Sequence, residues 1–213
     1  MLNTEREKQF LVDHFERTKK EAQAKRLEYY QGVIGRMLKE GREAEIPPMM
    51  VEIESLAIYD TLTGCFTEVG LLREMIYNKI PELIREKKSY AVIYMDMNNL
   101  KLINDTLGHN EGNKAISSMF KAARVSVRPG DLISRWTKGD EGLIVLEGCK
   151  SGDAQDVVSR IREHLPPNIG VSMGISEGPP DYNFLDIVSI AEQQMYEDKN
   201  LLKHTDTYGN KAR

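Results

Sequence analysis

Apolar and polar positions recur along the chain with two periods, and each period predicts a type of secondary structure. Short runs that are apolar, or that alternate apolar with polar, predict strands at 90–95, 132–136, 143–146 and 169–175. Longer stretches with apolar residues three and four positions apart predict helices at 50–59, 68–87, 97–107, 111–127, 151–165 and 184–204. Strands and helices therefore intermix, which favours an α/β (α+β) fold with a mixed central sheet flanked by helices.

The first 45 residues have a different pattern, polar and helical. Their apolar residues keep roughly heptad spacing at Leu11, Phe15, Ala22 and Tyr29, and the stripe continues at Val33, Ile34, Met37 and Leu38. Two interpretations fit this pattern: an amphipathic helix that packs on the domain of the same chain, and a helix for dimerisation or signal input. The apolar positions are too few to indicate a coiled coil. Pro47 and Pro48 are expected to break the helix.

Composition narrows the class of protein. Of 213 residues, 40% are hydrophobic and 29% charged, as in ordinary soluble globular domains. The net charge of −4 argues against a protein that holds nucleic acid through its phosphates. Cys65 and Cys149 lack metal or redox spacing, and the sequence shows neither a signal peptide nor an apolar run of membrane-spanning length. We therefore expect a cytoplasmic protein with no nucleic-acid partner and no membrane insertion.

Acidic residues stand at two places where a metal site could form. The first apolar run ends on Asp96, and Asp140 and Glu141 lie in the expected hairpin. An acid at the end of a buried strand can direct its carboxylate into a cleft at the sheet edge, whereas a single such acid is more simply a solvated side chain. Asp96 is followed at close spacing by further polar residues and glycines, namely Lys101, Asn104, Asp105, Gly108, His109, Gly112 and Asn113.

Four segments of the chain follow a known pattern. They are Asp60-Thr61-Leu62-Thr63-Gly64, the run Asp96 to Asn113, Lys138-Gly139-Asp140-Glu141-Gly142, and Met195-Tyr196-Glu197-Asp198-Lys199. Together they resemble the GGDEF family, the diguanylate cyclases. The resemblance implies a ferredoxin-like palm of the nucleotidyl-cyclase type over 59–204. A helical segment at 1–58, for dimerisation or input, would precede it, and a polar tail at 205–213 would follow.

The resemblance also implies a metal site and a reaction. Asp96, the backbone carbonyl of Met97 and Asp140 would hold Mg²⁺ or Mn²⁺, and Glu141 would complete the site or assist deprotonation. Asp96, Asp140 and Glu141 are thus the expected catalytic residues. Two nucleoside triphosphates would be joined into a 3′,5′-cyclic dinucleotide with release of pyrophosphate. Each subunit would hold one nucleotide, so a homodimer is implied.

Further substrate contacts are implied by the same motifs. Phosphate would be bound by Lys101, Gly139, Lys199 and Lys203, and the base would be read by Asn104 and Asn113. Arg128 and Asp131 resemble the family's product-binding inhibitory site, although the Pro-Gly pair between them would form a turn unaided.

The chain departs from the family pattern in its base-reading residues and in its hairpin. Asn113 stands where the family has Asp; an amide must donate as well as accept, so weaker guanine preference and possible adenine use are expected. In the hairpin, Lys138 replaces Gly, Gly142 replaces Phe, and one extra residue lies between Arg135 and the tip. Two interpretations stay open: an active cyclase with variant geometry, or a degenerate domain that binds a nucleotide or a partner without turnover.

Overall fold

The computed structural model describes residues 31–137 and 139–209, with their side chains except at 53, 54, 56 and 203–209. The chain divides into two compact units, Met1–Glu54 and Ser55–Arg213. Four predicted apolar positions lie outside the described residues: Leu11, Phe15, Ala22 and Tyr29. Among the described helices, none is long and apolar enough to cross a membrane.

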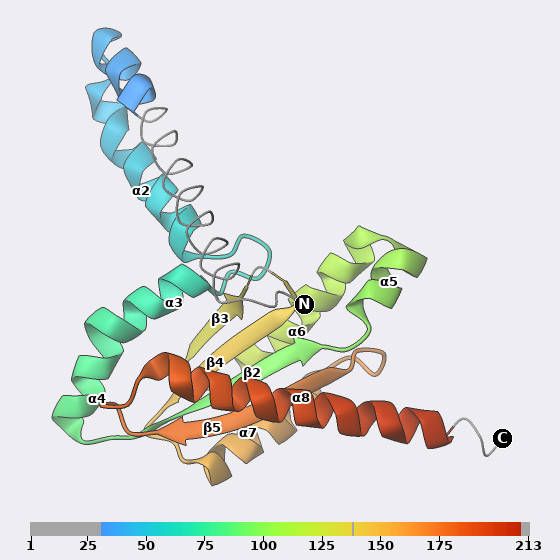
Figure 1. The fold of residues 1–213 in the computed structure, drawn as a ribbon. Helices are drawn as coiled ribbons and strands as arrows, with labels where there is room; N and C mark the ends of the chain where they lie inside the picture. Colours follow the sequence, from blue (N-terminus) through green and yellow to red (C-terminus); the bar gives the residue numbers. More distant parts are fainter. Residues whose placement is uncertain (1–30, 138, 210–213) are drawn as a thin grey trace, which may run out of the picture. The chain divides into compact units, whose positions relative to one another are not determined.

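The second unit is built on a mixed sheet of five strands, in the order β1-β3-β4-β2-β5 (Figure 1). The strands are β1 (Phe66–Thr67), β2 (Tyr90–Met97), β3 (Leu132–Trp136), β4 (Glu141–Glu147) and β5 (Val171–Gly178). β1 is parallel to β3, whereas β2 is antiparallel to both of its neighbours and β3 and β4 form a hairpin. The predicted mixed central sheet is confirmed.

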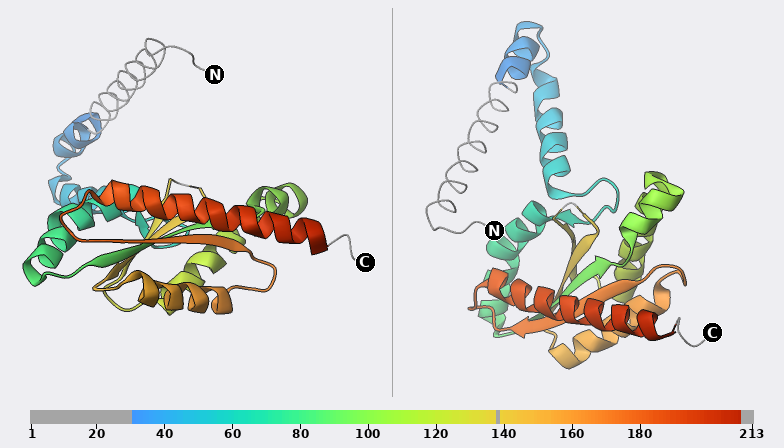
Figure 2. Two further views of the ribbon diagram at one scale, coloured as in Figure 1. Left: turned by 60° about the horizontal axis from the view of Figure 1, so that its bottom comes forward. Right: turned by 45° about the vertical axis from the view of Figure 1, so that its right-hand side comes forward.

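Helices cover both faces of this sheet. They are α3 (Glu68–Glu74), the π-helical turn η2 (Met75–Lys79), α4 (Ile80–Glu86), α6 (His109–Ser126), α7 (Ser151–His164) and α8 (Phe184–Gly209). A further helix, α5 (Leu100–Leu107), packs against α6. Alternate residues of β2 enter two separate cores, one under α6 and α7 and the other under α3, η2, α4 and α8. Figure 2 shows α8 and α7 on opposite sides of the sheet. All eight residues of β2 are buried because it is covered on both faces.

Several element boundaries differ from those predicted, because pairing with neighbours extends the strands. β2 continues through Asp96 and Met97, which pair with β5, so Asp96 is a strand residue. β4 begins at Glu141, which lies directly opposite Asp96. The helix predicted at 97–107 begins at Leu100, after Asn99 with a left-handed φ of 61°.

Two helices bury an apolar face against the sheet. The buried face of α6 is made by Ala115, Ile116, Met119, Phe120 and Ala123. That of α8 is made by Ile187, Val188, Ala191 and Met195, whereas Leu185 is 51% exposed. Thr67 is the N-cap of α3, and its Oγ1 accepts a hydrogen bond from the Gly70 amide at 3.1 Å.

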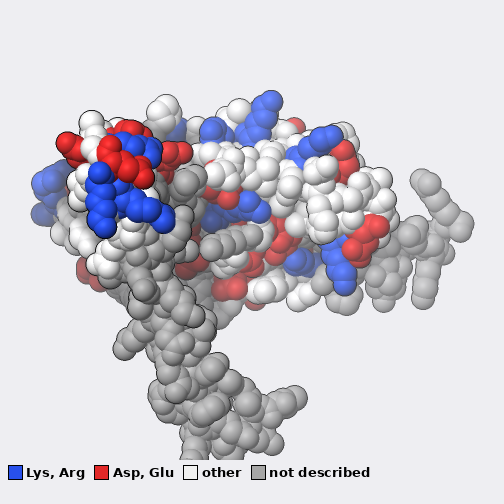
Figure 3. Space-filling view, turned by 90° about the horizontal axis from the view of Figure 1, so that it is seen from above, with Lys and Arg blue, Asp and Glu red and all other residues white. Residues whose placement is uncertain are grey.

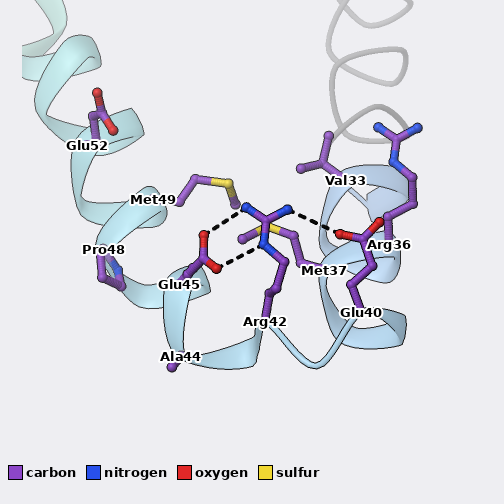
Figure 4. A pocket seen from close by; sticks show the side chains of 10 residues that line it. All are labelled: Val33, Arg36, Met37, Glu40, Arg42, Ala44, Glu45, Pro48, Met49 and Glu52. Carbon is purple, nitrogen blue, oxygen red and sulfur yellow. Dashed lines mark hydrogen bonds and ion pairs between the residues drawn. The ribbon is translucent and has the colours of Figure 1, made fainter.

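The described part of the first unit is a helical hairpin. A helix ends at 39 and is followed by η1 (Glu43–Glu45) and α2 (Ile46–Ile58). The predicted break at Pro47 and Pro48 is wrong: the chain turns at Gly41, with φ 68°, and both prolines lie in the first turn of α2, where an amide donor is not needed. At this turn, Arg42 binds Glu45 at 2.8 Å and Glu40 at 3.2 Å beside a hollow of about 660 Å³ (Figure 4).

Candidate active site

Asp96 is held over the face of the sheet that α8 covers. Its cross-strand partners are Glu141 of β4 and Ser172 of β5, and residues directly opposite in an antiparallel pair share a face. Asp96 is 8% exposed and makes an ion pair with Lys199 of α8. The helix can lie this close because Gly174 of β5 has no side chain; a Cβ there would overlap the backbone of α8. The fold thus brings together two predicted site residues that are far apart in sequence.

Asp140 precedes β4 and adds a second carboxylate. Burial raises its pKa, and the negative charge of Asp96 raises it further, while Lys199 partly offsets the effect. A raised pKa means that the ionised pair is unfavourable without enough positive charge nearby. Two carboxylates in this condition fit a divalent cation, because Mg²⁺ commonly takes one or two carboxylates and completes its shell with phosphate and water.

Another acidic cluster has no such shortage of positive charge. Carboxylate oxygens of Glu82, Glu86 and Glu147 lie within 4.8 Å of one another. Lys79 is 3.0 Å from Glu147, and Lys88 is 2.7 Å from Glu86. These lysines already supply the compensating charge, so we interpret the cluster as a structural ion-pair network.

Two side chains that the sequence did not single out lie near Glu141. Thr137, the residue after β3, donates its hydroxyl to Oε2 of Glu141. Tyr94 lies on β2, where burial raises its pKa and the nearby charge of Glu141 raises it further. No sequence spacing would have pointed to either contact, since the pattern of β2 marks Tyr94 simply as a buried strand residue.

The hairpin tip is tied to the start of the domain. Arg135 donates from Nε to the Gly139 carbonyl at 2.8 Å and pairs through Nη1 with Asp60 at 3.1 Å. Burial raises the pKa of Asp60, but hydrogen bonds from Thr63 and the charge of Arg135 outweigh burial, so the pKa lies below its ordinary value. Lys138 lies outside the described residues.

Gly142 leaves a space that neighbouring side chains fill. A Cβ at this position would overlap the methyl end of Met95 and would lie 2.9 Å from its Cγ and 3.1 Å from Phe120 Cε1. Met95 is the cross-strand partner of Gly142 and is fully buried. Met95 and Phe120 therefore occupy the space that a side chain at position 142 would need.

The two residues predicted to read the base meet at the corner between α5 and α6. The Asn104 side chain lies against Gly112, where a Cβ would overlap its Oδ1, and Asn113 is the next residue and is exposed. Lys101 is exposed on α5. The side chain of Lys203 lies outside the part that the structure describes. Roles for these residues stay predictions.

Arg128 and Asp131 form a closed turn between α6 and β3. The Asp131 carboxylate accepts the Arg128 amide at 2.8 Å and the Glu147 amide at 3.2 Å. The Arg128 side chain is exposed beside a hollow of about 390 Å³, which Arg124 also lines. Asp131 thus has a structural task of its own, and the inhibitory role stays a prediction.

Surface charge is mixed on the side of the molecule seen in Figure 3. There, Lys and Arg side chains of the described residues are interspersed with Asp and Glu. This distribution agrees with the small net charge of −4.

Comparison with known proteins agrees with this geometry. The family model for the GGDEF domain of diguanylate cyclases matches residues 57–204. The chain is 32% identical over 147 residues to the probable diguanylate cyclase DgcJ of Escherichia coli K12, a match that covers 67% of this chain and 29% of DgcJ.

Solved structures share the fold. The diguanylate cyclase SiaD of Pseudomonas aeruginosa, solved with its activator SiaC, matches with a TM-score of 0.62 and 24% identity, over 92% of this chain and 80% of that one. A coiled-coil and GGDEF fragment of DgcB from Caulobacter crescentus, solved with c-di-GMP, matches with a TM-score of 0.67 and 18% identity, over 79% and 94% of the two chains. The chain belongs to the GGDEF family, that of the diguanylate cyclase domains.

Proposed function

We propose that this domain is a nucleotidyl cyclase that condenses two nucleoside triphosphates into a 3′,5′-cyclic dinucleotide and releases pyrophosphate. GTP is the expected substrate and ATP the alternative. The observation that carries the proposal is the pair Asp96 and Asp140, two mutually repelling carboxylates beside the sheet, of which Asp96 is paired with Lys199. Family membership and relatives named diguanylate cyclase support it.

Each site residue then has a task. Bound Mg²⁺ or Mn²⁺ would neutralise triphosphate charge and favour ionisation of a ribose 3′-hydroxyl. Asp96, the Met97 carbonyl and Asp140 would hold the cation, and Glu141, opposite Asp96, would complete the site or accept the hydroxyl proton. Lys199 leaves Asp96 and turns to a phosphate, since a lysine side chain is a flexible point charge.

Asn113 sets the base preference of this proposed enzyme. The Asp of the family pattern can accept from both N1–H and N2–H₂ of guanine, whereas the amide of Asn113 accepts with one atom and donates with the other. We expect weaker selection of GTP over ATP, by about tenfold, than in Asn113→Asp. The measurement is kcat/KM for each nucleotide in both proteins. Equal GTP selectivity would remove the basis of this assignment.

The reaction requires two copies of the chain. One domain binds one nucleotide, so the two reacting nucleotides must be presented by facing subunits. We propose a homodimer, at least during turnover, to which the helical segment 1–58 contributes.

A second function is a nucleotide-binding or partner-binding domain without turnover. The altered tip favours it, because Thr137 adopts a left-handed φ of 54° and the extra residue changes the approach to Asp140. Incubation with Mg²⁺ and GTP, ATP or both, followed by mass identification of products, separates the two functions. Product that disappears in Asp140→Ala supports the enzyme; nucleotide binding with no product from a confirmed dimer supports the binding domain.

A further inference from the structure

A residue between β3 and the tip of the hairpin makes a contact with the site. Thr137 follows β3 directly and has a left-handed φ of 54°, uncommon for a β-branched residue. Glu141 opens β4 on the other side of the tip, and the Thr137 hydroxyl donates to its Oε2. A strained backbone with a specific hydrogen bond to a site carboxylate suggests a functional constraint.

A second side chain with a hydroxyl lies near the same carboxylate, inside the sheet. Tyr94 lies two residues before Asp96 on β2 and directly opposite Leu143, which makes it the diagonal neighbour of Glu141 on the same face. A diagonal pair is within reach of a long aromatic side chain. Tyr94 is 2% exposed, and the negative charge of Glu141 lies close enough to add to the effect of burial in raising the pKa of the tyrosine.

Tyr90 on the same strand provides an internal comparison. Its side chain points to the same face and is fully buried, yet its hydroxyl has no hydrogen-bond partner among the described residues. Burial alone raises its pKa to about 12. The two tyrosines thus share a strand, a face and a depth, and they differ in that Glu141 lies near Tyr94 but does not affect Tyr90.

We propose that Tyr94 and Thr137 are positioning residues that hold the Glu141 carboxylate beside Asp96 and thereby raise the affinity of the site for a divalent cation. The inference rests on the proposed function, because it assigns Glu141 a role at the metal. A glutamate side chain has three rotatable bonds. The hydroxyls of Tyr94 and Thr137 would restrict its conformations, so that less conformational entropy is lost when Glu141 binds a cation. Both hydroxyls are neutral, so they would orient the carboxylate without the positive charge that Lys199 brings to Asp96.

Four variants of the full chain test this proposal. Thr137→Val and Tyr94→Phe each remove one hydroxyl at nearly constant shape, Thr137→Ser restores a hydroxyl, and Tyr90→Phe is the matched control. Mn²⁺ binding to the protein alone is measured by electron paramagnetic resonance of the free ion. Product formation from GTP is measured in parallel as separate kcat and KM values.

We expect Thr137→Val and Tyr94→Phe to bind Mn²⁺ about tenfold more weakly, the lower end of the effect of losing an outer-shell partner. Their kcat should fall while KM for GTP changes less than about twofold, since Glu141 is not assigned to base or ribose binding. Thr137→Ser and Tyr90→Phe should match the wild type. Unchanged or tighter Mn²⁺ binding in both hydroxyl-deleted variants, or no Mn²⁺ binding by the wild type, would overturn the proposal.

The two readouts keep this proposal separate from the proposed function. A wild-type protein that binds Mn²⁺ but forms no product refutes the cyclase, while the Mn²⁺ affinities of the variants still decide whether the hydroxyls position Glu141. A wild-type protein that forms product with variants indistinguishable from it refutes the positioning role and leaves the cyclase intact.

Discussion

The packing of Met95 over Gly142 predicts how Gly142→Ala changes stability, because a gain from removing a strand glycine competes with a loss from overpacking. Glycine inside a strand is destabilising by about 0.5–1 kcal/mol relative to alanine, so Gly142→Ala would ordinarily stabilise β4. Here the new Cβ overlaps the end of Met95 and lies 3.1 Å from Phe120. Overpacking of this kind destabilises by about 1–3 kcal/mol. We therefore expect Gly142→Ala to lower the free energy of unfolding by about 1–2 kcal/mol, measured by urea denaturation.

A double-mutant cycle assigns the loss to Met95. Met95→Ala alone opens a cavity in the core and should destabilise by about 2–5 kcal/mol. In Met95→Ala/Gly142→Ala the added methyl group has room and refills part of the cavity. The double variant should therefore be more stable than the sum of the single effects by at least about 1 kcal/mol.

Gly152→Ala is the matched control for this cycle. A Cβ at Gly152 meets no atom within 4 Å, and the residue lies in α7, so the change should be neutral or slightly stabilising. If Gly142→Ala were as stable as the wild type, or if the two changes in the cycle were additive, the argument that Met95 fills the space beside Gly142 would be wrong.

Two further predictions concern ion pairs. Lys199→Met leaves the buried Asp96, beside Asp140, without its lysine partner, so the free energy of unfolding should fall by about 2 kcal/mol. Mn²⁺ should then raise the melting temperature of this variant more than that of the wild type. An equal Mn²⁺ effect in both proteins would contradict the charge argument. Asp60→Asn breaks the link to Arg135 and should destabilise by about 1–3 kcal/mol at pH 7. The pKa of Asp60 is lower in the folded state, so its ionised carboxylate stabilises the fold fully above its ordinary pKa of about 4 and less as the pH falls further. The difference in free energy of unfolding between the wild type and Asp60→Asn should therefore shrink below about pH 4. A constant difference down to about pH 2 would refute this.

The sequence was informative where local pattern and structure have the same cause. The buried run at 90–95 predicted the central strand because a strand covered on both faces must be apolar throughout. Its end was misplaced because Asp96 is polar, and a polar residue is normally a sign that burial has ended. The ladder with β5 keeps Asp96 and Met97 in the strand, and Lys199 supplies the charge that makes Asp96 tolerable there.

Contacts between distant segments could not be read from local pattern. Asp60 and Arg135 are 75 positions apart, and the sequence marks each only through its own motif. The break in the N-terminal helices was misplaced for a different reason: Pro-Pro was interpreted as a stop, although prolines are also favoured in the first turn of a helix. The chain instead turns at Gly41, whose left-handed φ is readily adopted by glycine.

The altered signature of the hairpin is accompanied by contacts from neighbouring elements. Met95 and Phe120 fill the space that a side chain at Gly142 would need. After β3, Thr137 donates its hydroxyl to Glu141, so one of the two acids of the tip has a defined partner. Such contacts are compatible both with an active cyclase and with a domain that binds without turnover, and the product assay therefore decides between the two.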